Sequence, residues 1–219
     1  MSNPKTVQIM TTNETTRVHN LIIVDESGSM SVIQKQAFAG MNETLQTIRQ
    51  MQTKHPSQEQ RVTLLTFDTG HTTWHYDNAP AAKTKDLAPE AYCPSGGTPL
   101  YDAIGKGIAR VNARTQKGDH VLVTIITDGE ENSSEEWTLR MVRNMIEKLK
   151  PQGWTFTLIG TDNLDVETMA RSFAIDDHLQ FSENAEDTSA MFAKERRCRE
   201  NYYGCLLKED EVPQGKFFD

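Results

Sequence analysis

The sequence predicts an α/β fold in which a central, mostly parallel sheet is covered by helices on both faces. Segments with strand-like and helix-like patterns alternate from residue 18 to residue 205, as they do in sheets built from right-handed crossovers. The strand-like segments 18–24 and 121–127 carry successive aliphatic residues, which is typical of strands buried on both faces. No internal repeat or second core is visible in the 219 residues, so we expect one principal domain.

The first half of the chain predicts three strands and one helix. Residues 18–24 form the first strand, and a loop follows it. Apolar residues then recur every three or four positions, which predicts an amphipathic helix that ends near His55; they are Ile33, Ala37, Met41, Leu45, Ile48 and Met51. Residues 61–67 form the second strand, and 71–76 follow after a short turn as its edge hairpin partner.

The second half begins with a long irregular stretch over residues 77–97, which contains three prolines and Gly96-Gly97. Thr98 is expected to cap the next helix, with Pro99 in its first turn. The remaining pattern predicts strands at 121–127, 154–160 and 178–181, and helices at 139–149, 166–173 and 184–205.

Three parts of the chain are expected from these patterns: an N-terminal arm (1–16), the α/β domain (17–205) and a flexible acidic tail (206–219). In the arm, Val7 and Ile9 alternate with polar residues, so a short edge strand is one interpretation. In the tail, Phe217-Phe218 are interpreted as part of a frayed end, with a docking peptide as the alternative.

Composition narrows the function classes. The formal net charge is −8, which argues against a general binder of nucleic acid or of anionic membranes, since phosphate affinity comes mainly from Lys and Arg. No apolar run approaches the length of a membrane helix, and no secretory signal is visible. The three cysteines, Cys93, Cys198 and Cys205, do not form a disulfide framework. We therefore expect a cytoplasmic protein.

Hydroxyl and carboxylate side chains collect where predicted strands end or helices begin. Asp25, Ser27 and Ser29 follow the first strand, Thr98 precedes a helix, and Asp128 ends the strand at 121–127. The carboxyl ends of parallel strands meet at one edge of the sheet, where ligands bind. An all-oxygen set suits magnesium, calcium or manganese. With two carboxylates the set is short of charge and ligands, so the ion keeps an open position for an external carboxylate.

The three segments DESGSM, SGGTPLYDAI and ITDGEEN resemble the von Willebrand factor type A (VWA) domain. The metal-ion-dependent adhesion site of that family reads D-x-S-x-S, then Thr, then Asp, and Asp25, Ser27, Ser29, Thr98 and Asp128 match it. The resemblance implies a three-layer Rossmann-like fold with six strands in the order 3-2-1-4-5-6, strand 3 antiparallel. Within that family, the sequence is similar to the intracellular bacterial members near tellurite-resistance and chelatase systems.

Simpler interpretations stand beside this one. Asp25-x-Ser27-x-Ser29 could be a helix cap. Asp102 could be stabilised by the helix dipole, or it could form a hydrogen bond to a hydroxyl or a water molecule of the site. Asp68 is expected to form a turn. Three acids that flank the candidate ligands are expected to form a solvated acidic rim; they are Glu26, Glu130 and Glu131.

A zinc site at His71, His75 and Cys93 is the less favoured reading, because few other ligands are near. Trp74 and Tyr76 are expected to pack against the sheet. Enzyme motifs for phosphate loops, dinucleotides and nucleophile elbows are missing from the sequence.

We therefore expect a metal-dependent protein-binding module, not an enzyme, whose partner donates Asp or Glu to the ion. The alternatives are a magnesium-dependent phosphohydrolase, in which Ser27 stands where the second acid is needed, and a scaffold or regulatory subunit with a purely structural metal.

Overall fold

The computed structural model describes residues 16–208 and 216–219. Within them, six strands form one sheet in the order β3-β2-β1-β4-β5-β6. All neighbouring strands are parallel except β2 and β3, which are antiparallel. The predicted order and the antiparallel third strand are confirmed. The strands are β1 (Thr16–Asp25), β2 (Gln58–Phe67), β3 (Thr72–Pro80), β4 (His120–Thr127), β5 (Trp154–Thr161) and β6 (Asp177–Phe181).

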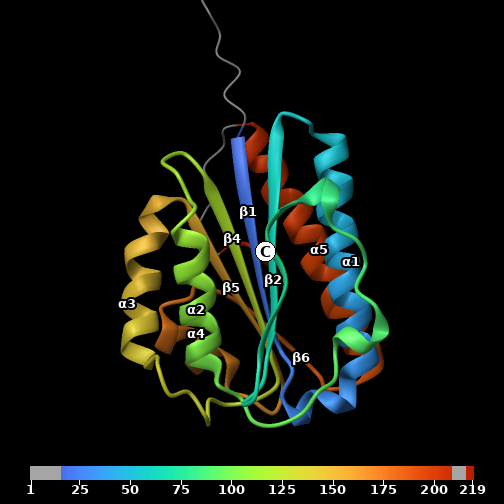
Figure 1. Cartoon of the computed structure of the whole chain (residues 1–219), viewed down its shortest axis with the longest axis vertical. Helices are drawn as coiled ribbons and strands as arrows, with labels where there is room; N and C mark the ends of the chain where they lie inside the picture. The colour runs from blue at the N-terminus through green and yellow to red at the C-terminus, as the bar shows by residue number, and fades with distance from the viewer. Residues whose placement is uncertain (1–15, 209–215) are drawn as a thin grey trace, which may run out of the picture.

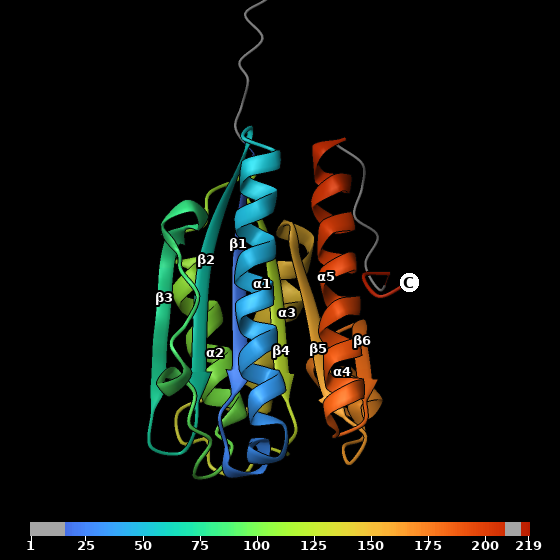
Figure 2. The ribbon, with the colours of Figure 1, turned by 90° about the vertical axis from the view of Figure 1, so that its right-hand side faces the viewer.

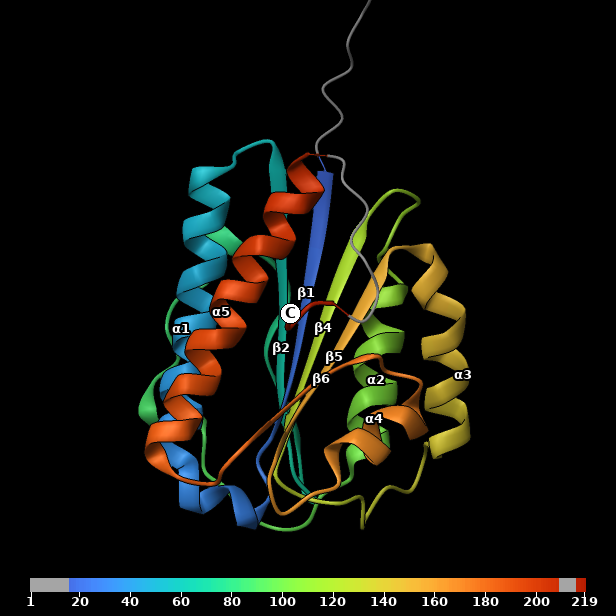
Figure 3. The ribbon, with the colours of Figure 1, turned by 180° about the vertical axis from the view of Figure 1, so that it is seen from behind.

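Helices cover both faces of the sheet, so the molecule has three layers (Figure 1). α1 (Gln34–Lys54) and α5 (Ala185–Leu207) lie side by side on one face. α2 (Leu100–Asn112), α3 (Leu139–Leu149) and α4 (Val166–Phe173) lie on the other, as the view from behind also shows (Figure 3). The described residues also contain four short 3-10 helices: η1 (Gly28–Ile33), η2 (Ala81–Lys83), η3 (Pro89–Ala91) and η4 (Lys150–Gln152).

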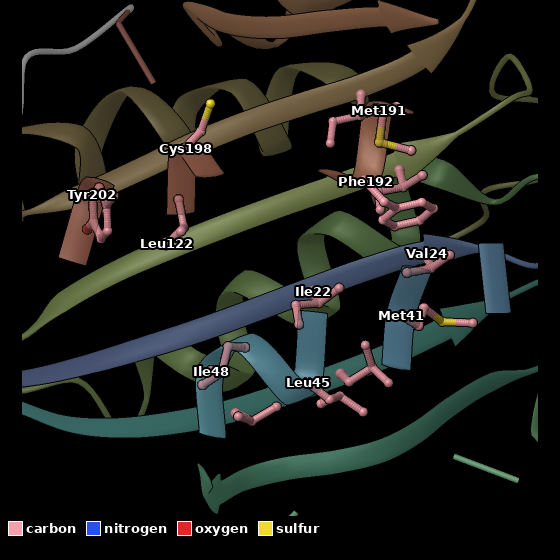
Figure 4. Close-up of a cluster of buried hydrophobic side chains, with 14 of the residues drawn as sticks. Ile22, Val24, Met41, Leu45, Ile48, Leu122, Met191, Phe192, Cys198 and Tyr202 are labelled. Atoms are coloured by element: carbon pink, nitrogen blue, oxygen red, sulfur yellow. The ribbon is translucent and has the colours of Figure 1, made fainter. Parts of the chain in front are cut away.

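The aliphatic strands fill a core on each side of the sheet. Successive side chains of a strand point to opposite faces, so Ile22 and Val24 of β1 join the cluster under α1 and α5, while Leu21 and Ile23 join the cluster under α2, α3 and α4. Figure 4 shows the first cluster, where Leu45 and Phe192 are among the helix residues that meet the sheet. This two-sided burial explains why residues 21–24 of β1 are aliphatic on both faces of the sheet.

Strands β1, β2, β4 and β5 run in the same direction, so their carboxyl ends meet at the lower end of the molecule in Figure 2. The loops that follow them gather at this edge. The fold therefore brings residues from distant parts of the sequence to one end of the sheet.

Several element boundaries differ from the sequence predictions. The first helix begins at Gln34, because Gly28–Ile33 forms the 3-10 helix η1 and contains Ile33. β3 extends to Pro80, and two 3-10 helices lie in the rest of the stretch 77–97, which was expected to be irregular throughout. These differences arise where sheet pairing and tight turns outweigh local pattern.

The last residues do not form a frayed end. Phe217 and Phe218 are 7% and 9% exposed and belong to the core cluster under α1 and α5. The backbone N–H of Phe217 donates to Oδ1 of Asp177 at 2.6 Å, and its ring lies 6.1 Å from that of Tyr202 on α5. The frayed-end interpretation was therefore wrong for these two residues. The strand expected at Val7 and Ile9 lies outside the described residues.

In the part of the chain that the structure describes, no helix is both long enough and apolar enough to cross a membrane. The cysteines Cys93, Cys198 and Cys205 are free thiols, as expected.

Candidate functional site

A chain of hydrogen bonds joins three of the five candidate residues at the carboxyl edge of the sheet. The Oγ atoms of Ser27 and Ser29 lie 3.1 Å apart, and Ser29 Oγ donates to Oδ1 of Asp128 at 2.8 Å. The convergence expected at the carboxyl ends of the strands is present, and Ser29 contributes to it from the 3-10 helix η1. Ser27 is buried and Ser29 is exposed, so the cluster reaches the surface.

Asp25 holds the base of this cluster. It ends β1 and is fully buried. Its Oδ1 accepts the backbone N–H of Ser27 at 2.7 Å, and its Oδ2 accepts the hydroxyl of Thr127 at 2.6 Å. One carboxylate thus fixes the start of the serine loop and ties it to the end of β4.

Thr98 lies beside the cluster and is 2% exposed. Its Oγ1 borders Gly129 so closely that a Cβ atom at that glycine would lie 2.8 Å from it. Among the described residues no hydrogen bond joins the Thr98 hydroxyl to the other four candidates. Its backbone N–H donates to Oδ1 of Asn132 at 2.8 Å, which holds the threonine against the loop that carries Asp128.

The two carboxylates are electrostatically uncompensated. Asp128 is 2% exposed, and its Oδ2 is a buried oxygen for which the described residues supply no hydrogen-bond partner. Burial raises the pKa of Asp128 to about 6, with a further contribution from the charge of Asp25. Burial also raises the pKa of Asp25. Buried carboxylates in this condition favour a proton or a cation.

Thr98 is not the helix cap that the sequence predicts. α2 begins at Leu100, and no side-chain cap bond is made at its N-cap position. The N–H groups of Tyr101 and Asp102 instead donate to Glu131 Oε2 and Ser134 Oγ, at 2.9 and 3.1 Å. The cap comes from the loop after β4, so the Thr98 hydroxyl is not used for it.

Asp102 lies in the first turn of α2, where an acid is favoured by the helix dipole, and it also binds the loop after β4. Its carboxylate accepts three backbone N–H groups of the same loop, at 2.7–3.2 Å, from Glu135, Glu136 and Trp137. It therefore fastens that loop to α2, and among the described residues no hydrogen bond joins it to a candidate ligand.

The expected acidic rim is only partly present. The Glu131 carboxylate also accepts the N–H groups of Ser133 and Ser134, so it is a structural acceptor. Glu26 accepts the N–H of Cys93 at 2.5 Å. Glu130 is exposed, and in the described ranges its carboxylate has no hydrogen-bond or ion-pair partner. Asp68 forms the expected turn, accepting the N–H groups of Gly70 and His71.

Several supporting residues were not predicted from sequence. The hydroxyl of Tyr92 donates to the backbone oxygen of Asp25 at 2.7 Å, and Asn163 donates to that of Asp128 at 3.3 Å. Asn132 and Asn163 follow the ends of β4 and β5, and this position at the carboxyl edge of the sheet could have identified them as residues that support the site. Tyr92 lies in an irregular stretch with no signal of its own.

The histidines interpreted as the less favoured zinc ligands have other contacts. His75 Nε2 lies 3.0 Å from Thr66 Oγ1, and the exposed His71 ring lies 3.4 Å from Asp68. Within the described residues, no group of three or more His, Cys, Asp or Glu side chains could hold a metal ion. The five candidate residues at the sheet edge include only two such side chains, Asp25 and Asp128, since the other three are hydroxyls. Trp74 packs beneath Arg110, whose guanidinium carbon is 4.3 Å from the ring centroid.

Comparison with known proteins gives one family. The family model described as the von Willebrand factor type A domain matches residues 21–194. A search of curated proteins returned no match.

Solved structures share the fold at low sequence identity. The vWF domain of the type V pili tip protein Mfa5 from Porphyromonas gingivalis is 14% identical, with a TM-score of 0.60, over 91% of this chain and 98% of that one. The SpRpn10 VWA domain is 13% identical, with a TM-score of 0.57, over 82% and 94%. The PilB minor pilin from Streptococcus sanguinis is 12% identical, with a TM-score of 0.58, over 86% of this chain but 62% of PilB. The chain thus spans less than two thirds of the length of PilB.

Proposed function

Because the chain belongs to the von Willebrand factor type A domain family, whose members are generally protein-interaction modules, we propose that it binds a protein partner through a divalent cation. Asp25, Ser27, Ser29, Thr98 and Asp128 are the residues that would hold the ion. The observation that carries the proposal is the buried Oδ2 of Asp128, which has no hydrogen-bond partner in the described residues.

The donor set fits a hard cation. Its side-chain donors are carboxylate and hydroxyl oxygens, which magnesium, calcium and manganese prefer. The raised pKa values of Asp25 and Asp128 mean that their ionised forms lack compensating charge, and a bound dication supplies it. Magnesium is the ion we propose first, since it is bound through few carboxylates and keeps several waters.

The composition of the set also indicates what the partner donates. Three of the five groups are neutral hydroxyls, so the two carboxylates would leave a bound ion with an open position. Ser29 is exposed, which gives an incoming group access to this edge. We propose that the partner supplies an Asp or Glu carboxylate, and that binding rather than catalysis is the function. The proposal keeps the cytoplasmic location expected from the sequence, which cell fractionation tests.

Partner capture with and without magnesium tests this function. The immobilised chain is incubated with native lysate in magnesium or in chelator, and the retained proteins are identified. We expect proteins that are retained in magnesium, released by chelator and lost with Asp25→Ala while circular dichroism shows an intact fold. Asp162→Asn is the matched control, because Asp162 is an exposed acid that follows β5 at the same edge.

Retention that is unaffected by chelator and by Asp25→Ala would contradict the proposal.

Once a magnesium-dependent partner is identified, substitution of its acidic residues tests directly whether it donates a carboxylate to the ion. A panel of phosphate esters examines the phosphohydrolase alternative: magnesium-dependent hydrolysis that disappears in Asp25→Asn would favour it.

A further inference from the structure

A cavity of about 250 Å³ lies between the start of α2, the loop after β4 and the helix α4. Its apolar wall includes Leu100, Tyr101, Met169 and Phe173, and its acidic residues include Glu130 and Asp165. The function proposed above does not use this cavity.

The cavity adjoins the candidate ion site along three segments of the chain. Leu100 comes two residues after Thr98, and Glu130 comes two residues after Asp128. Asp165 comes two residues after Asn163, whose side chain donates to the backbone oxygen of Asp128. Two residues of chain span at most about 7 Å, so a partner segment at the ion site reaches the cavity within a few residues.

The walls suit a long aliphatic stem. The rings of Tyr101 and Phe173 meet edge to face with centroids 5.8 Å apart, and Phe173 and Leu100 are buried. Lys and Arg side chains bury their methylene stems against such surfaces and keep the charged end near polar groups.

The charged side chains that line the cavity are all negative. Three of its lining residues are acids, and no described lining residue is Lys or Arg. The Glu131 carboxylate is occupied by backbone N–H groups, whereas the exposed Glu130 has no partner in the described ranges. Asp165 accepts the N–H of Thr168 at 2.9 Å. The pKa of the Asp165 carboxyl is lowered by its hydrogen bonds with Thr168 and, to a lesser extent, by the charge of Arg171, which is itself paired with Glu167. The nearby cation Arg143 donates to the backbone oxygen of the lining residue Ser172, but its charge is paired with Glu147.

We propose that this cavity takes a Lys or Arg side chain of the same partner segment whose carboxylate reaches the ion. The inference rests on the proposed function and makes it more specific: the partner carries an acidic residue with a basic residue within about four positions of it. Charge complementarity selects a cation at Glu130 and Asp165. The unpartnered Oδ2 of Asp128 independently marks the proposed position of the ion that the partner's acidic residue would reach.

Selection from a random displayed-peptide library tests the inference without a known partner. The library is bound to the full chain in magnesium and eluted with chelator. The pocket variant is Glu130→Gln with Asp165→Asn, since asparagine still caps α4. The control variant is Glu90→Gln with Glu135→Gln, which removes two exposed acids that do not line the cavity. The affinity of each protein for manganese alone is measured in parallel.

We expect chelator-eluted peptides to share an acidic residue with a nearby Lys or Arg. The pocket variant should lose the basic enrichment and bind a selected peptide roughly five- to tenfold more weakly, with manganese affinity unchanged. The control variant should behave as wild type. Acidic peptides without basic enrichment, or enrichment that persists in the pocket variant, would overturn the role of the cavity alone. Failure to bind manganese and to select any chelator-eluted peptide would overturn the proposed function and the cavity's role with it.

Discussion

The hydroxyl of Ser29 donates a hydrogen bond of 2.8 Å to Oδ1 of Asp128, 99 residues further along the chain. This bond joins the loop after β1 to the loop after β4. Because it occupies only Oδ1, the other oxygen of the carboxylate stays buried without a partner in the described residues. The geometry thus gathers negative charge at the sheet edge, and the unpartnered oxygen is the atom that we propose binds an external cation.

Removing that charge should stabilise the metal-free protein. The pKa of Asp128 is raised from 3.8 to about 6, so its ionised form destabilises the fold above that pH, and stability is lost as pH rises from 3.8 to 6. In chelator at neutral pH, Asp128→Asn should raise the free energy of unfolding by about 1–2 kcal/mol. Magnesium should stabilise wild type and leave the variant unchanged. Urea unfolding in both buffers checks this, and an equal magnesium response in the two proteins would count against it.

A methyl group at Gly129 should disturb ion binding more than folding. The added Cβ would lie 2.8 Å from Thr98 Oγ1, so the hydroxyl must move. We expect Gly129→Ala to weaken manganese binding at least about tenfold, or by about 1.4 kcal/mol, as measured by titration calorimetry. Gly204→Ala is the control, because its Cβ meets nothing within 4 Å and α5 should gain about 0.5–1 kcal/mol from the change. Equal affinities in the two variants would remove Thr98 from the donor set.

The buried pair of Arg199 and Glu195 should be strongly coupled. Both side chains are almost fully buried, and Arg199 Nη2 donates to Glu195 Oε1 at 2.6 Å and to Thr124 Oγ1 at 2.8 Å. Arg199→Met leaves Glu195 buried and unpaired, so it should cost about 3–5 kcal/mol. The double variant Arg199→Met/Glu195→Leu should recover most of that loss in urea unfolding. Additive losses would show that the two residues do not act as a pair.

Acidification from about pH 8 to 6.5 should destabilise the metal-free protein, by about 1 kcal/mol in total. Burial lowers the pKa of His19, His75 and His120 from 6.5. The unfolded chain therefore takes up protons first, and stability falls as pH drops through 6.5. The window stays above the pKa of Asp128, whose effect has the opposite sign. Urea unfolding of wild type and His75→Gln/His120→Gln should show a smaller drop in the variant; a stability that does not fall would contradict this.

The C-terminal phenylalanines should contribute to global stability. Phe217 is 7% exposed and meets Phe218 edge to face at 4.9 Å. We expect Phe217→Ala to cost about 2–3 kcal/mol, somewhat below the range for central core positions. The exposed neighbour Lys216 provides the control Lys216→Ala, which should change thermal stability by less than about 0.5 kcal/mol. Equal melting temperatures for the two variants would show that the segment is dispensable.

Local sequence was sufficient to predict the parallel α/β sheet and the edge at which the candidate residues lie, whereas the strand order came from the family resemblance. Aliphatic strands that end in Asp25 and Thr127-Asp128 predict a buried parallel sheet whose acids share one edge, and parallel pairing of β1 with β4 confirms it. The periodicity of apolar residues indicates which segments are strands or helices and which of their faces are buried, and this periodicity is visible within a short stretch of sequence.

The rest depends on contacts between distant segments. Glu131 caps α2, and Asp102 binds the backbone of Glu135–Trp137, because folding places the loop after β4 against the start of that helix. Phe217 looks like part of a charged tail in sequence, and its burial depends on the surface that α5 and β6 create. Residue type and spacing carry no signal for such pairings.

Binding of manganese, followed by electron paramagnetic resonance, tests the central claim most directly. Titration of wild type, Asp25→Asn, Asp128→Asn and the control Asp162→Asn counts the ions held by each folded protein. The account predicts a single bound ion in wild type and in the control, and none in the two site variants. A wild-type protein that binds no ion, or site variants that bind it as tightly as wild type, would contradict the account.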